Sequence, residues 1–129
     1  MLFKAPEDLL KMWLSRVNEG DIEGILALYD EQAILIPTFS NRLLNGPQKR
    51  REYFENLVHR EDLSIALHEK TLAVQALEAS LHSLCGIYCW RFAVEGELLS
   101  FEARFSFLVD LARLNPILHH HTSQIPRTL

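Results

Sequence analysis

The feature that most constrains the fold is a change of hydrophobic period after Asp62. Before it, apolar residues recur at helical spacing; after it, they alternate along extended stretches. We predict strands, joined by connections short enough for antiparallel hairpins, at 64–77, 81–94, 98–110 and 117–123. Helices followed by a meander predict an α+β domain, with the helices on one side of a curved antiparallel sheet.

Three helices are expected in the first half of the chain. Residues 6–19 form an amphipathic pattern that ends at Gly20. Asp21 can cap a second, short helix whose apolar face includes Tyr29, and Pro47 suits the first turn of a third helix. A short strand is expected at 33–37.

Composition narrows the class of protein. The 129 residues predict one domain spanning 1–129, with 48% hydrophobic and 23% charged residues. A net charge of −4 argues against nucleic acid as a partner, and no apolar run is long enough for a membrane partner or anchor. No signal peptide is evident. Cys85 and Cys89 would lie roughly 13 Å apart on one strand, too far for a disulfide, so we expect reduced thiols and a cytoplasmic location.

Three segments resemble a known family. Arg-Glu-Tyr-Phe-Glu-Asn-Leu at 51–57, Cys-Gly-Ile-Tyr-Cys-Trp-Arg at 85–91, and Glu102-Ala-Arg104 with His119-His-His-Thr-Ser123 are similar to the association domain of calcium/calmodulin-dependent protein kinase II and its bacterial stand-alone relatives. That domain has the cone-shaped, cystatin-like fold of nuclear transport factor 2, shared with SnoaL-like and ketosteroid isomerase-like proteins. The resemblance implies this fold and self-association as a homodimer or larger homo-oligomer. His120 stands where the family has an aromatic residue.

Strand register separates two faces of the predicted sheet. A two-residue turn at Glu95-Gly96 places Arg91 opposite Ser100 and Ile87 opposite Arg104. A last turn centred on residues 112–113 would pair Arg104 with His121 and Ser106 with His119. One face then carries polar residues and the other aromatic ones, and His120 points away from Arg104.

Two arrangements satisfy this pattern. Either the polar face lines an enclosed cavity beneath the helices, or it faces solvent and the aromatic face is the core. The related association domain has arginines in a deep pocket, which favours the first arrangement. The aromatic face would then be covered by another subunit.

The candidate ligand-binding residues follow from the first arrangement: Arg91, Arg104, His119, His121, Glu102, Tyr29 and Ser123. Two arginines in a cavity would bind a small polar or anionic ligand such as a carboxylate, unless Glu102 pairs with one of them. The histidines could transfer protons or be hydrogen-bonded sheet residues. With Glu102 as the third ligand they give a weak metal signature, and we predict neither a metal nor a cofactor.

Three classes of function remain open, one of which, by analogy with the kinase domain, is a pure assembly module. The first of the other two is a small pocket domain that binds a polar or anionic ligand and self-associates through its sheet. The second is a SnoaL-like enzyme, of isomerase, dehydratase or hydrolase type, with a histidine as base and an arginine stabilising the anion formed from a carbonyl compound. No catalytic residue is assigned. Carboxylate binding that is lost in Arg104→Ala without any turnover would favour the pocket domain over the enzyme, and a monomer at micromolar concentration would exclude an assembly role.

Overall fold

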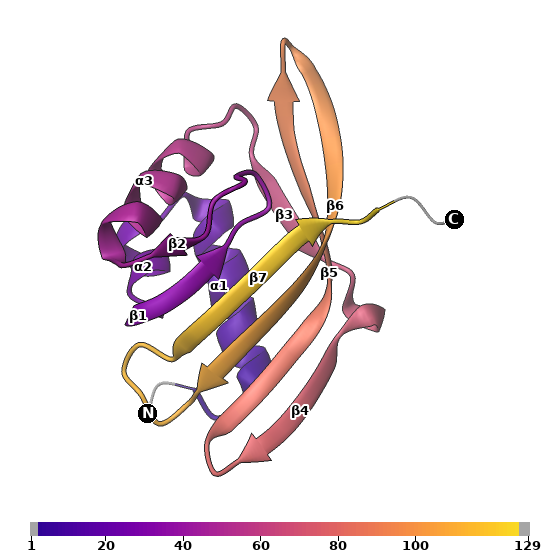
Figure 1. Cartoon of the computed structure of the whole chain (residues 1–129). Coiled ribbons are helices and arrows are strands. Elements are labelled where there is room, and N and C mark those ends of the chain that lie inside the picture. Colours follow the sequence, from indigo (N-terminus) through magenta and orange to yellow (C-terminus); the bar gives the residue numbers. More distant parts are fainter. Residues whose placement is uncertain (1–2, 127–129) are drawn as a thin grey trace.

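A computed structural model describes residues 3–126 and has a helical first half and a β-rich second half (Figure 1). The elements in chain order are α1 (Pro6–Glu19), α2 (Ile22–Leu26), β1 (Tyr29–Ile36), β2 (Leu44–Asn45), α3 (Pro47–Val58), β3 (Ser64–Leu67), the 3₁₀ turn η1 (Glu69–Thr71), β4 (Ala73–Glu78), β5 (Leu81–Val94), β6 (Glu97–Asp110) and β7 (Ile117–Gln124). Figure 1 shows α1 behind the sheet and α3 beside β1 and β2. This is the predicted α+β architecture.

Residues at the helix ends explain where each helix begins or stops. Pro6 and Pro47 occupy first turns, where a missing N–H costs nothing. Gly20 ends α1 with φ 69°, a left-handed conformation that favours glycine. The Asp21 side chain accepts a hydrogen bond of 2.9 Å from the Gly24 N–H and caps α2. No helix within residues 3–126 is long and apolar enough to cross a bilayer.

The seven strands form one sheet in the order β2-β1-β7-β6-β5-β3, with β4 also pairing with β5. The long β5–β6 hairpin has the predicted register: Arg91 lies opposite Ser100 and Ile87 opposite Arg104. Glu95 and Gly96 make its turn with φ values of 52° and 81°, as a two-residue hairpin turn requires.

Three sequence predictions were wrong in detail. Tyr29 begins β1 and is not part of the second helix. The strand expected at 64–77 is two strands separated by η1. Strand β3 pairs with residues 88–91 of β5, and β4 pairs with residues 81–85. Arg104 lies opposite Ser123, and Ser106 opposite His121. This register differs by two residues from the predicted one, so the same side chains still share a face.

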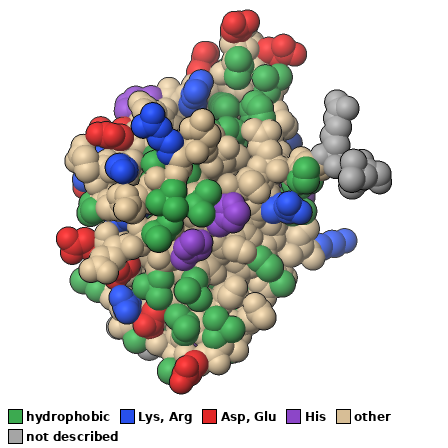
Figure 2. All heavy atoms as spheres, viewed as in Figure 1, with side chains coloured by type: hydrophobic (Ala, Val, Ile, Leu, Met, Phe, Trp, Pro, Cys, Tyr) green, Lys and Arg blue, Asp and Glu red, His purple; other side chains and the backbone are tan. Residues whose placement is uncertain are grey.

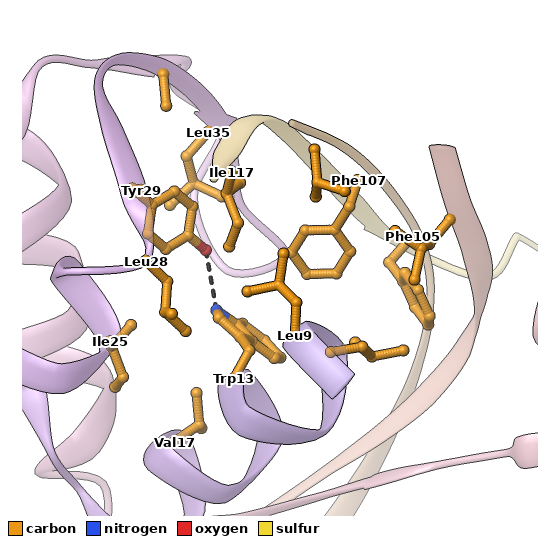
Figure 3. Packing of buried hydrophobic residues seen from close by; sticks show 14 of the residues in the cluster. Leu9, Trp13, Val17, Ile25, Leu28, Tyr29, Leu35, Phe105, Phe107 and Ile117 are labelled. Atoms are coloured by element: carbon orange, nitrogen blue, oxygen red, sulfur yellow. Dashed lines mark hydrogen bonds between the residues drawn. The ribbon is translucent and has the colours of Figure 1, made fainter. Parts of the chain in front are cut away.

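The core lies between α1 and the sheet (Figure 3). Trp13 projects from α1 onto the aromatic side of the meander and stacks on Tyr88 with ring centroids 5.7 Å apart. The Tyr88 ring stacks in turn on Phe105 at 4.6 Å. Aromatic side chains bury a large apolar area each, so this contact between helix and sheet contributes much of the stability.

A buried arginine joins α3 to β1. The Arg50 side chain is only 2% exposed and donates hydrogen bonds to the backbone carbonyls of Ala33, at 2.8 Å, and Asp30, at 2.9 Å. A further bond of 3.2 Å reaches the Glu31 carbonyl. Its guanidinium also lies 5.7 Å from the Tyr29 ring centre. One side chain therefore satisfies three carbonyls at the start of β1.

We predict that Arg50→Met lowers the free energy of unfolding by about 2–3 kcal/mol, because it leaves buried carbonyls without a donor. Urea denaturation measures this change. Arg51→Met is the matched control, because Arg51 is the next residue and forms a surface ion pair with Glu23. An equal effect of the two substitutions would contradict the assigned role of Arg50.

Candidate functional site

The polar face of the meander is open. We call the side of the sheet away from α1 the outer face. Arg91, Arg104 and His121 are exposed on it, whereas Trp90 and Tyr88 on the opposite side are 2% and 0% exposed. The prediction of an enclosed cavity lined by the polar face is therefore wrong, and the alternative, with the aromatic face as core, is correct. The physical reason is Trp13, which gives the aromatic face a partner within its own chain.

The outer face separates the predicted site into two shallow grooves. Arg104 lies in a groove of about 420 Å³ that is also lined by His121 and Ser123. Arg91 lies with Glu102 in a second groove of about 380 Å³. The two arginines stand four register positions apart along β5, roughly 13 Å. In this structure the two arginines therefore line separate grooves.

The other candidates are further apart. His119 lies opposite Leu108 and lines neither groove. Glu102 is 3.7 Å from His68 Nδ1 and forms no ion pair with either arginine among the described residues. Tyr29 is in the core, 3% exposed. Within residues 3–126, no three metal-ligating side chains cluster.

Figure 2 views the outer face. Histidine side chains lie there among hydrophobic ones in the middle of the face. The register places Ile34 and Ile36 of β1 beside His119 and His121 of β7, and both isoleucines are half-buried. The outer face is thus an apolar and histidine-rich strip bordered by arginines.

A polar chain crosses the core behind this strip. The Trp13 indole N–H donates to the Tyr29 hydroxyl at 3.0 Å (Figure 3). The Tyr29 hydroxyl is 2.8 Å from His120 Nδ1, and His120 Nε2 is 3.2 Å from the Tyr88 hydroxyl. His120 is 1% exposed and points away from Arg104, as predicted.

The surroundings of His120 favour its neutral form. The Tyr29 hydroxyl accepts from Trp13 and, because a hydroxyl both donates and accepts, it can still pair with His120 Nδ1 in either direction. A neutral His120 has one donor and one acceptor nitrogen, so it can bond to the hydroxyls of both Tyr29 and Tyr88. Burial, together with the neighbouring charges of His119 and His121, holds the pKa of His120 well below its ordinary value.

The space under the helices is filled. The cavity beside Trp13 measures about 10 Å³ and is lined by apolar side chains, including Leu84 and Phe107. Such a volume holds one water at most. Among the described residues 3–126, this cavity between α1 and the sheet is therefore too small for a substrate.

Sequence reasoning missed this chain and Arg50. His120 was the one visible signal, because a histidine between alternating outward histidines must point to the other face. Its partners Trp13, Tyr29 and Tyr88 come from three other elements, so no local spacing connects them. Arg50 gave no signal, because it sits in a basic run that resembles an exposed helix face.

The profile of the calcium/calmodulin dependent protein kinase II association domain matches residues 7–126. The chain belongs to that family. No curated protein matches it. The association-domain profile covers both grooves of the outer face and the polar chain through His120.

Solved structures show the same fold. An association domain of this kinase type from Xanthomonas campestris has a TM-score of 0.84 at 21% identity, covering 95% of this chain and 86% of that one. An NTF2-like protein with a cystatin-like fold from Novosphingobium aromaticivorans has a TM-score of 0.75 at 11% identity, covering 94% and 80%. A ketosteroid isomerase-like protein from Erwinia carotovora atroseptica has a TM-score of 0.73 at 15% identity, covering 94% of each chain. The predicted nuclear transport factor 2-like fold is confirmed.

We predict that His120 makes this association domain sensitive to acid. Its pKa is depressed in the folded state, so as pH falls the unfolded chain binds the proton first, near its ordinary value of about 6.5. Below that pH, the unfolding free energy of the wild type should fall by about 1.4 kcal/mol more per pH unit than that of His120→Gln. Urea denaturation between pH 7.5 and 5.5 measures the two slopes, with exposed His59→Gln as control. Parallel slopes for wild type and His120→Gln would contradict the neutral assignment.

Proposed function

We propose that this domain is an assembly module that self-associates through the outer face of its sheet. The observation that carries the proposal is the strip on β1, β7, β6 and β5, which no other element covers within residues 3–126. It combines half-buried isoleucines and Leu108 with His119 and His121. The association domain family adds support, because its name describes assembly.

The strip is large enough for a stable contact. With about 3.3 Å per residue and about 4.8 Å between strands, the four strands cover roughly 700 Å² in projection. Each partner in a standard interface contributes about 800 Å² once side-chain relief is counted. In a two-fold arrangement the patch meets itself, so Glu102 of each copy can face an arginine of the other.

Ser106→Glu tests this assembly. Ser106 lies at the middle of the strip, between Cys85 and His121, so two copies would each bury a new carboxylate. We expect the wild type to have at least twice the monomer mass at micromolar concentration in light scattering, and the variant to be a monomer.

Gln48→Glu is the matched control for this experiment. Gln48 is exposed in the first turn of α3, away from the sheet, and a carboxylate there suits the helix N-terminus. This variant should associate like the wild type. A monomeric wild type, or association that survives Ser106→Glu, would reject the outer face as the interface.

The groove around Arg104 supports a second role, binding a small carboxylate. Arg104 has no carboxylate within 4.0 Å among the described residues. Ser106, Ser123 and His121 offer further polar groups in the same groove. A free guanidinium beside hydroxyl donors suits a carboxylate of a few carbons, held by charge-assisted hydrogen bonds.

The enzyme alternative has less support. A SnoaL-like reaction needs a base and an anion-stabilising group around an enclosed substrate. Here the arginines and the outer histidines are open to water, and the interior is filled by rings. The ketosteroid isomerase-like neighbour shares the fold at 15% identity, and fold alone does not carry activity.

The two cysteines support a reducing, cytoplasmic environment for this assembly module. Cys85 and Cys89 are free thiols, Cys85 exposed and Cys89 buried. Structural disulfides are the rule in oxidising compartments and rare in the cytoplasm. A cytoplasmic location therefore suits the thiol state of both residues.

We predict that Arg104→Ala weakens the binding of small carboxylates such as pyruvate by at least tenfold, through loss of a charge-assisted contact. Calorimetric titration measures the affinity. Arg91→Ala is the matched control, because Arg91 lies in the neighbouring groove and should leave binding unchanged. Equal losses in both variants would show that one site spans both arginines, against the geometry described above.

A further inference from the structure

A larger groove lies beside α3 and adjoins the edge of the outer face, because Arg42 and Leu43 of this groove also line a hollow with His121. It measures about 710 Å³ and runs between α3 and the segment that leads into β2. Figure 1 shows α3 lying next to that segment. Helix α3 contributes Lys49, Glu52, Tyr53, Asn56 and Leu57, and Arg60 follows it; the facing segment contributes Phe39, Ser40, Arg42, Leu43 and Leu44. The volume falls within the usual range for small-molecule sites, about 300–1,000 Å³.

The floor of the groove is apolar and held in place. Leu44 and Leu57 are 8% and 4% exposed, and Phe39 and Tyr53 are half-buried. The Phe39 ring packs against Trp90, with ring centroids 5.7 Å apart, and against Phe101, at 5.5 Å. The Phe39 N–H donates to the Tyr53 hydroxyl at 3.4 Å. The floor is therefore formed before any ligand arrives.

The rim of the groove is cationic. Arg42, Lys49 and Arg60 are exposed, and none has a carboxylate within 4.0 Å in the part of the chain that is described. Lys49 Nζ reaches only the Asn45 amide oxygen, at 3.4 Å, and the Arg60 guanidinium lies 5.3 Å from the centre of the Phe92 ring. The single acidic residue of the groove, Glu52, accepts a hydrogen bond of 3.2 Å from Gln48.

We propose that this groove binds a small molecule with an apolar body and one carboxylate. The body lies on Leu57, Tyr53 and Phe39, and the carboxylate meets the cations of the rim. Three cations against one carboxylate leave the groove positive on a chain whose net charge is −4. This excess selects anions, while small hydrophilic ones gain nothing from covering the partly exposed apolar surface of Phe39, Leu43 and Tyr53.

The test uses 2-naphthoate, its neutral methyl ester, and acetate as probes, titrated into the full chain by calorimetry. We expect 2-naphthoate to bind at least tenfold more tightly than either of the others, because only it supplies both parts. Its affinity should fall at least threefold between 50 and 300 mM salt, because exposed cations are screened.

Variants then locate the site. The double substitution Arg42→Gln, Lys49→Gln should weaken 2-naphthoate at least tenfold, and Leu43→Glu, at the exposed apolar edge, should do the same by repulsion. Arg104→Gln on the outer face is the matched control and should leave the affinity unchanged. The Ser106→Glu protein should bind 2-naphthoate like the wild type, because Ser106 does not line this groove, so failure here and failure of the outer-face assembly remain distinguishable.

Three results would overturn the proposal. One is equal affinity for the ester and the acid, which would show that the cations play no part. The second is full affinity in the Arg42, Lys49 double variant. The third is that 2-naphthoate does not bind at millimolar concentration. Binding of an acidic peptide in its place would equally contradict the proposal.

Discussion

The structure depends on a hydrogen-bond chain inside an aromatic core. Trp13 donates to the Tyr29 hydroxyl, and the two ring nitrogens of His120 bond to the hydroxyls of Tyr29 and Tyr88. Burying four polar side chains costs free energy unless each finds a partner, and here each does. Because the partners come from α1, β1, β5 and β7, the chain also fixes how the helix lies on the sheet. A neutral His120 is the condition for this arrangement.

Filling the interior with rings moves possible chemistry to the surface. In a cone-shaped fold, the space between helix and sheet is the natural place for an enclosed site. Here Trp13, Tyr88 and Phe105 occupy it in a continuous stack. Apart from Arg50 and His120, which are buried, the charged groups described above lie on the outer face and around α3, where water has access. Binding and association are functions that such surfaces perform without excluding solvent.

The sequence was sufficient for the long β5–β6 hairpin and insufficient for the sidedness of the sheet. The Glu95-Gly96 turn fixed the β5–β6 register, and strict alternation put His120 opposite to His119 and His121. Alternation is symmetric, however, and does not state which face is buried. The contact of Trp13 with Tyr88 and Trp90 determines which face is buried, and Trp13 lies about 75 residues before them in the chain. The grooves were equally inaccessible, because they depend on distances between elements that no spacing reveals.

Phe39 connects the closed interior to the open groove. Its ring covers the end of the core by packing on Trp90 and Phe101, and its other side is part of the floor against α3. Phe39 therefore covers one end of the core and also provides a surface on which an apolar ligand can lie. The segment at 39–44 thus packs on the aromatic core through Phe39 and forms one wall of the groove beside α3. The proposed ligand site therefore lies outside the filled interior, and the packing that fills the interior also shapes the groove.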